Sequence, residues 1–283
     1  GTELRRETIL TLEALGIPVE SSHHEAAPSQ HEIDLRYTDA FTMADTVMTY
    51  KSVVKEIAAT HGFYASFMPK PIFGENGNGM HTHMSLFNGD ENAFLNKNNP
   101  NQLSDIGKQF CAGLLKHARE ITLVTNQWVN SYKRLVPSYE APTYISWAEV
   151  NRSDLIRIPS YKKDRPNSRR IEYRAPDPAC NPYLTFSVIL AAGLEGIQNE
   201  YILPESPHIS VDLMTNNQRK EAGIETLPTN LWEAIQITEN SELVRNTLGE
   251  TAFNVFIENK KIEWESYSAQ ISDFEIRKYL PSL

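Results

Sequence analysis

The chain has 283 residues, 40% of them hydrophobic, and a formal charge of −9 at pH 7. This length allows one large domain or two with a sizeable core, and the acidic balance argues against a general affinity for nucleic acid. No run of about 18 apolar residues is present to span a membrane. Cys111 and Cys180 form neither a disulfide framework nor a metal-binding pair, and the polar start is unlike a secretion signal. We therefore expect a cytoplasmic protein.

The first expected elements are a helix, a strand and a long helix. The helix covers Glu3–Leu15, and Gly16 is placed to end it. The segment Glu32–Tyr37 alternates polar and apolar residues, which predicts a strand with one polar face. A long helix should follow, ending near His61.

Strands return after this helix. We expect them over Phe63–Met68 and Met80–Phe87, joined by an irregular loop rich in proline and glycine. The Asn-rich segment 88–101 reads as a surface loop.

The second half of the chain is mainly helical in pattern. Ser104 can cap a helix that runs to His117, and Asn181 can cap an almost wholly apolar helix, expected to be central and buried, that ends near Asn199. Leu231–Thr238 and Leu243–Ile262 have mixed faces typical of peripheral helices. Strands followed by helices without βαβ alternation predict an α+β fold, an antiparallel or mixed sheet backed by helices.

Carboxylates and imidazoles recur at four places. They are Glu25 after His23 and His24, Glu32 after Gln30 and His31, the pair His81 and His83, and Glu172. Oxygen-dominated ligands suit Mg²⁺ or Mn²⁺, and the lack of cysteine ligands argues against structural zinc. The alternative for each histidine is an ordinary hydrogen-bonded residue.

The segment 170–174 places Arg170, Glu172 and Arg174 on one face of a strand because side chains alternate with a period of two. Ile171 and Tyr173 take the other face and suit a core. The charged face indicates either a cleft for an anionic ligand or an ordinary solvated surface.

Further cationic side chains precede this strand: Lys133, Arg134, Arg152, Arg157 and Arg169. Arginine binds carboxylate and phosphate in a bidentate manner, and phosphoryl transfer uses such charges beside divalent metal, so the pattern suits ATP-dependent activation of a carboxylate. Glu140 lies on a proline-flanked loop. It could take a proton from an incoming nucleophile or shield an acyl phosphate, and the alternative is a surface glutamate.

The run Asn76-Gly77-Asn78-Gly79 allows backbone amides to approach a small polar ligand. It lacks the spacing of a P-loop and opens no helix, so a simple turn is the alternative reading.

Together these motifs resemble type I glutamine synthetase. The matching segments are His24-Glu25 with Gln30-His31-Glu32, Asn76 to His83, Lys133 to Pro142, Asn151-Arg152-Ser153, and Arg170 to Arg174. The resemblance runs in order from about Glu20 to Asn181 and continues less specifically beyond. It implies the guanidino-kinase-like catalytic-domain fold of that family over residues 1–283, incomplete at the N-terminus.

The resemblance also implies roles for individual residues. Glu25 and Glu32 would bind one metal, His81 and Glu172 a second. Glutamate would be bound by Asn76, Gly77, Arg134 and Arg174, with Glu140 as the flap carboxylate that deprotonates ammonium. ATP would be bound by Glu20, His83, Ser85, Arg152, Arg157 and Arg170, with Arg152 also catalytic. The implied reaction converts glutamate and ATP to γ-glutamyl phosphate, which ammonia then attacks, in a homo-oligomer that is a dodecamer in the family.

Three departures from the family pattern bear on this expectation. The chain begins after the family's small β domain and after a strand with two further metal carboxylates, so the site should be incomplete. Asn78 and Ser138 replace the usual serine and glycine, and the segment 208–213 lacks the tyrosine that adenylylated members modify. Two alternatives stay open: ligation of polyamines or other amines, and a non-catalytic structural role.

Overall fold

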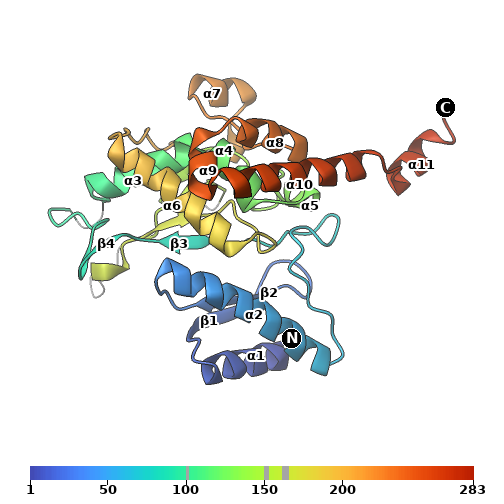
Figure 1. Ribbon diagram of the computed structural model, residues 1–283, viewed down its shortest axis with the longest axis horizontal. Coiled ribbons are helices and arrows are strands. Elements are labelled where there is room, and N and C mark those ends of the chain that lie inside the picture. The colour runs from blue at the N-terminus through green and yellow to red at the C-terminus, as the bar shows by residue number, and fades with distance from the viewer. Residues whose placement is uncertain (100–101, 150–152, 161–165) are drawn as a thin grey trace.

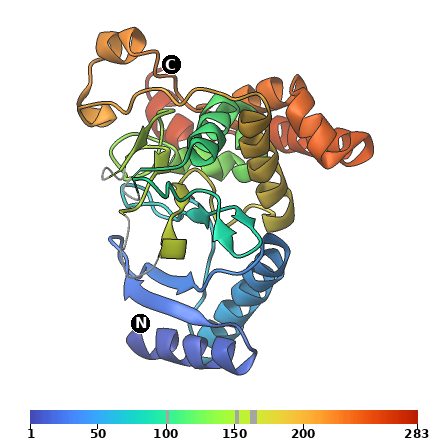
Figure 2. The same cartoon turned by 90° about the vertical axis from the view of Figure 1, so that its left-hand side faces the viewer.

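The computed structural model describes residues 1–99, 102–149, 153–160 and 166–283. Figures 1 and 2 show the N-terminal elements at one end of the molecule, the helices of the second half at the other, and short strands between them. The strands and helices together confirm the predicted α+β class.

The N-terminal layer contains two helices and one hairpin. Helix α1 (Thr2–Ala14) packs on helix α2 (Ala40–Thr60), and strands β1 (Val19–His24) and β2 (His31–Leu35) pair antiparallel. The expected helices and the second strand are confirmed. Strand β1 was not predicted because polar residues fill both of its faces, and only its pairing with β2 defines it as a strand.

The segment after α2 differs from the prediction. Residues 63–68 form no strand, and Tyr64 is 93% exposed, because this stretch lies against no partner strand. The second predicted strand shrinks to β3 (Thr82–Met84) and the first two residues of a small hairpin, β4 (Phe87–Asn88) with β5 (Glu91–Asn92). Strand β5 lies within the segment 88–101 that was expected to be a surface loop.

The central sheet has four short strands in the order β3-β8-β7-β6. Strands β6 (Trp147–Ala148) and β7 (Ile156–Arg157) are parallel, whereas β8 (Ile171–Tyr173) is antiparallel to both of its neighbours. The sheet is therefore mixed, as predicted, and β8 lies at its centre.

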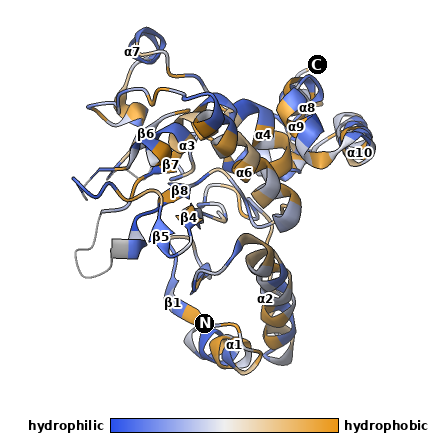
Figure 3. Ribbon diagram, turned by 60° about the vertical axis from the view of Figure 1, so that its left-hand side comes forward, coloured by the Kyte–Doolittle hydropathy of each residue, from blue (hydrophilic) through white to orange (hydrophobic). Residues whose placement is uncertain are grey.

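Helices cover the sheet away from the N-terminal layer. They are α3 (Asp105–Lys116), α4 (Ala118–Thr125), α5 (Val129–Arg134), α6 (Pro182–Gln198), α8 (Leu231–Glu239), α9 (Glu242–Leu248) and α10 (Glu250–Ser268). The Ser104 and Asn181 side chains cap α3 and α6, as expected. Hydrophobic colouring is strong in α3, α4 and α6 in Figure 3, where much of the core lies.

Three expectations for these helices need correction. The segment 243–262 is not one helix, because Gly249 adopts a left-handed φ of 77° and separates α9 from α10. Leu231 and Val244 are in the core, so α8 and α9 are not merely peripheral. Helix α6 is only partly buried, since Leu194 is exposed.

The remaining elements are short. They are the 3₁₀ turns Pro166–Ser168 and Val211–Leu213, α7 (Asn216–Glu221) and α11 (Asp273–Tyr279). Helix α11 projects from the body and exposes Phe274 and Leu280 (Figure 1). Within the described ranges, none of the helices has the length and apolar character required to cross a membrane.

Candidate active site

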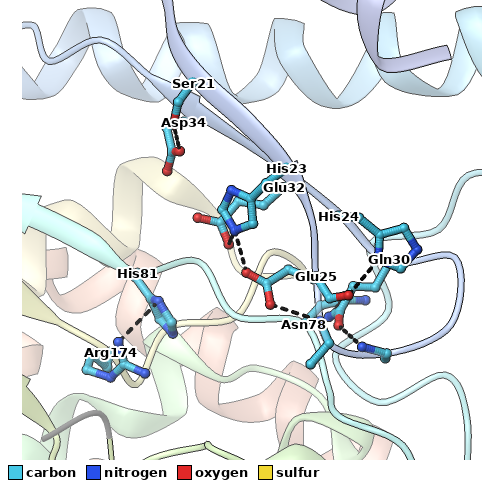
Figure 4. Close-up of polar contacts among 12 residues, drawn as sticks. Ser21, His23, His24, Glu25, Gln30, Glu32, Asp34, Asn78, His81 and Arg174 are labelled. Atoms are coloured by element: carbon cyan, nitrogen blue, oxygen red, sulfur yellow. Dashed lines mark hydrogen bonds and ion pairs between the residues drawn. The ribbon is translucent and has the colours of Figure 1, made fainter. Parts of the chain in front are cut away.

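The β1–β2 hairpin brings together four side chains that we call the hairpin group: His23, Glu25, Glu32 and Asp34. His23 stands opposite Glu32 in the register of the two strands. Its Nε2 atom is 2.8 Å from Glu25 Oε1 and 3.9 Å from Glu32 Oε2 (Figure 4). Ligand atoms of His23, Glu32 and Asp34 all lie within 4.8 Å of one another.

The pKa values of two carboxyls in the hairpin group shift in opposite directions. Burial and a hydrogen bond with Glu25 raise the pKa of Glu32 to about 8. Burial would also raise the pKa of Glu25, but hydrogen bonds with Glu32, His23 and the Ala26 amide lower it. Burial is the main cause of the rise for Glu32, and the negative charges of Asp34 and Glu25 add to it. A cation bound here would oppose both effects.

A second set of side chains, the sheet group, surrounds Glu172 at the centre of β8: His81, Arg157 and Arg174. Arg174 Nη1 donates to Glu172 Oε1 at 2.7 Å, and Arg157 Nε donates to the other carboxylate oxygen. His81 Nδ1 lies 3.5 Å from Glu172 Oε1. Glu172 is only 2% exposed, so the charged face of β8 lies inside the protein and the solvated alternative is wrong.

The protonation states of the sheet group favour ligand binding. Burial would raise the pKa of Glu172, but the charges of His83, Arg174 and Arg157 lower it, so this residue is a carboxylate. Burial and the nearby Arg174 guanidinium hold the pKa of His81 well below its usual value. His81 is therefore a neutral imidazole, the form that binds metal.

The two groups lie in the same region of the molecule. Gln30 of the hairpin donates to the Gly77 carbonyl at 3.0 Å, and Figure 4 shows His81 and Arg174 beside the hairpin group. Desolvation lowers the pKa of His83, while the charges of Glu172 and Asp34 oppose this effect. Asp34 is therefore close enough to act electrostatically on β3.

The spacing of these donors suits divalent cations. Two ligand atoms at about 2.1 Å from one octahedral ion lie between about 3 and 4.2 Å apart. The His23–Glu32 distance of 3.9 Å and the His81–Glu172 distance of 3.5 Å both fall in that range. The structure thus brings His81 next to Glu172, and it brings Glu25 and Glu32 next to the same imidazole, that of His23.

Two members of the hairpin group are absent from the metal ligands that the sequence predicted. Asp34 shares the polar face of β2 with Glu32, and the two-residue period alone could have identified it. His23 precedes a predicted ligand by two residues, but its contact with Glu32 depends on the unpredicted strand β1.

The loop 76–79 packs directly on Arg134. A Cβ on Gly77 would lie 2.5 Å from the Pro69 carbonyl oxygen and 2.9 Å from Arg134 Cγ, and one on Gly79 would lie 2.7 Å from Arg134 Nη2. Both glycines are required by this close approach. The structure therefore places Gly77 beside Arg134, the arginine with which the sequence grouped it.

Arg134 itself is almost fully buried, with 2% of its surface exposed. It donates to the carbonyl oxygens of Ala175 at 2.6 Å and Arg174 at 3.0 Å, and burial lowers its pKa to about 10. Arg134 thus fixes the backbone that carries Arg174, which is itself buried next to Glu172.

Glu140 lies on an exposed loop beyond α5. Ser138 and Glu140 have left-handed φ angles of 76° and 54°. Such angles favour glycine, so both residues adopt a conformation that is unfavourable for them. The Glu140 side chain is exposed, and its position depends on the conformation of this loop, since the residue lies outside the sheet.

The remaining predicted residues have mixed positions. His83 stands opposite Glu172 in register and accepts a hydrogen bond from Arg170 Nε at 3.1 Å, and Ser85 follows the same strand. Glu20 is exposed on β1. Arg152 lies outside the described residues.

Comparison with known proteins agrees with these motifs. The family model described as "Glutamine synthetase, catalytic domain" matches residues 1–279. The glutamine synthetase of Mycolicibacterium smegmatis is 54% identical over 276 residues, covering 98% of this chain and 62% of that protein. That of Methanosarcina mazei is 50% identical over 281 residues, covering 99% of this chain and 62% of its own length.

Solved structures give the same result. A structure titled "GmaS/ADP complex-Conformation 1" superposes with a TM-score of 0.88 at 34% identity, over 99% of this chain and 64% of that one. A second, titled "Apo GmaS without ligand", gives a TM-score of 0.85 at 35% identity, over 98% and 62% of the two chains. The chain therefore belongs to the glutamine synthetase family and spans slightly less than two thirds of the length of these relatives.

Proposed function

We propose that this protein is an ATP-dependent ligase that joins ammonia to the γ-carboxyl of glutamate through γ-glutamyl phosphate, giving glutamine, ADP and phosphate. The observation that carries the proposal is the buried sheet group around Glu172, next to the hairpin group. A carboxylate–imidazole pair at metal-binding distance, flanked by two arginines, suits a phosphorylated ligand with divalent cations. The ADP complex of the similar GmaS structure supports a nucleotide site.

In this proposal the two groups bind Mg²⁺ or Mn²⁺. Glu25 and Glu32 hold one ion and His81 and Glu172 the other, and the ions would neutralise the charge that develops on the transferred phosphoryl oxygens.

The arginines bind and orient the substrates. Arg157 and Arg170 lie on either side of Glu172 and His83 and provide positive charge toward phosphate, with Arg152 assigned to the same role. Arg174, fixed by Arg134, provides a guanidinium for the carboxylate of glutamate. Asn76 and Gly77 complete the glutamate site, and Glu20, His83 and Ser85 that of ATP.

Glu140 has the role of general base. Its exposed loop position lets it approach the bound glutamate and take the proton that ammonium releases before attack on the acyl phosphate. The same carboxylate would hold water away from the reactive intermediate.

A second candidate is ligation of another amine. It is favoured by the likeness to the GmaS structures, although identity to the named glutamine synthetases is higher, at 54% against 34%.

A homo-oligomeric state also forms part of the proposal. Exposed apolar residues such as Phe274 and Ile276 on α11 and Phe41 on α2 suit contacts between copies. A cytoplasmic location is consistent with two free, buried cysteines.

The test combines binding with turnover. ATP binding should require Mg²⁺ and be lost in Glu172→Ala, while Glu91→Ala on the exposed β5 should bind normally. Phosphate release in the presence of glutamate should depend on ammonium more than on methylamine or polyamines. Faster phosphate release with methylamine or a polyamine than with ammonium would select the second candidate. Mg²⁺-independent ATP binding in Glu172→Ala would overturn the assignment of the metal residues.

A further inference from the structure

Lys70 contacts two segments of the site that are far apart in sequence. Its Nζ atom donates to the Glu75 carbonyl, next to Asn76, and lies 3.6 Å from the centroid of the Tyr139 ring. No role was assigned to Lys70 by any of the motifs. The ammonium group of Lys70 therefore connects the loop with Asn76 and Gly77, proposed to bind the substrate glutamate, to the loop with Glu140.

The backbone of Lys70 is itself fixed. Its amide donates to Asn130 Oδ1 at 2.7 Å, and its carbonyl accepts from Asn130 Nδ2 at 3.0 Å. Asn130 belongs to α5, the helix that ends at Arg134. The backbone of Lys70 is thus held against α5, and its side chain reaches Tyr139.

The loop it contacts has few other restraints. Ser138 and Glu140, on either side of Tyr139, both have left-handed φ angles, which are unfavourable for residues other than glycine. Their side chains form no hydrogen bond with any residue in the described ranges. A loop in this conformation needs an outside contact to stay in place, and the ammonium–ring contact of Lys70 provides one.

We propose that Lys70 is a positioning residue that holds the Tyr139–Glu140 loop beside the glutamate-binding loop. The site role of Glu140 rests on the proposed function, whereas the restraint on the loop does not. Loss of the Lys70 charge should free the loop, and glutamate affinity should fall because Glu140 no longer closes over it.

A glutamyl endopeptidase tests the restraint directly, because Glu140 is an exposed cleavage site within the loop. Lys70→Met keeps the aliphatic stem without the charge and should raise the rate of cleavage after Glu140 on the order of fivefold, the effect expected from losing one cation–π contact. Lys70→Arg can stack on the ring and should restore the slow rate. Tyr139→Phe keeps the ring and is the matched control.

The cleavage assay is combined with a double-mutant cycle and with a measurement of glutamate binding. Lys70→Met and Tyr139→Leu should not be additive, because each removes the same contact. An unchanged cleavage rate in Lys70→Met, or additive effects, would overturn the proposal. Faster cleavage in a chain that binds no glutamate would instead support the restraint and overturn the proposed function.

Discussion

His23 and Glu32 face each other across the β1–β2 hairpin, with 3.9 Å between His23 Nε2 and Glu32 Oε2. Asp34 lies two residues further along β2 and therefore turns to the same face as Glu32. Ligand atoms of one imidazole and two carboxylates thus lie within 4.8 Å of one another, and the His23–Glu32 distance suits a divalent cation. The hairpin contributes more donor atoms than the two glutamates that the family motif identifies.

The first prediction concerns Asp34. Replacing it with Asn keeps the shape but removes a negative charge near Glu32, so Mn²⁺ affinity should fall by about tenfold, a common loss when a residue supporting a metal ligand is changed. The Glu32→Gln substitution should lower Mn²⁺ affinity further. An Mn²⁺ titration by electron paramagnetic resonance measures both, with Glu56→Gln on the exposed face of α2 as the charge-matched control. Equal affinities for Asp34→Asn and the control would exclude Asp34 from the cation site.

The second prediction compares two arginines that flank the central strand β8, Arg170 and Arg174. Arg174 contacts Glu172 and is buried, whereas Arg170 contacts His83 and is half-exposed. Arg174→Ala should therefore weaken glutamate binding more than ATP binding, and Arg170→Ala should do the reverse. Calorimetric titration with each ligand measures the two effects. Equal losses of both ligands in both variants would mean that the arginines maintain the fold rather than select a substrate.

Sequence patterns predicted the elements whose signals are local. The Asn181 cap with Pro182 and the stop at Gly16 need only neighbouring residues, and both are found in the structure. The prediction that Glu172 lies on a charged strand face was also correct. The burial of that face, however, depends on the neighbouring strands β7 and β3, which come from other parts of the sequence. Local pattern therefore identified the residue, and only the sheet decided between core and surface.

The errors arose where distant contacts decide structure. Residues 63–68 are rich in aromatic and apolar side chains, as many strands are, yet no strand lies beside them. The role of Arg134 in binding glutamate stays a prediction, but the two backbone carbonyls to which its guanidinium donates, partners that a buried charge requires, could not be read from the sequence. Gly249 is different, since a glycine inside a helical pattern was a visible local signal of the break between α9 and α10.

A third prediction concerns stability in acid. Burial would raise the pKa of Glu120, but hydrogen bonds with His117 and Ser241 lower it below 4.5. A lowered carboxyl pKa means that the folded state binds the proton less readily than the unfolded state. Glu120 therefore stabilises the fold above about pH 4.5, and this contribution is lost as pH falls through the lower, folded-state pKa.

Urea unfolding between pH 3.5 and 7 tests this sign. Glu120→Gln should lower the free energy of unfolding by about 1 kcal/mol at pH 7, the usual value of a lost hydrogen bond, and by less at the acid end. Glu258→Gln, exposed on α10, should follow the wild type throughout. A difference that grows as pH falls would contradict the assignment.

The last prediction concerns the crossing of α3 and α6. A Cβ on Gly196 would lie 2.2 Å from the Gln109 carbonyl oxygen and 2.7 Å from Gly113 Cα, so it would meet backbone atoms that cannot move aside. Alanine in an open helix is favoured over glycine by about 1 kcal/mol, but here Gly196→Ala should instead cost about 2 kcal/mol. Gly107→Ala in α3 is the control, because its Cβ would meet only side-chain atoms at 3.2 Å or more. Urea midpoints should fall for Gly196→Ala with an unchanged slope, and equal midpoints for the two variants would show that the helices can separate without cost.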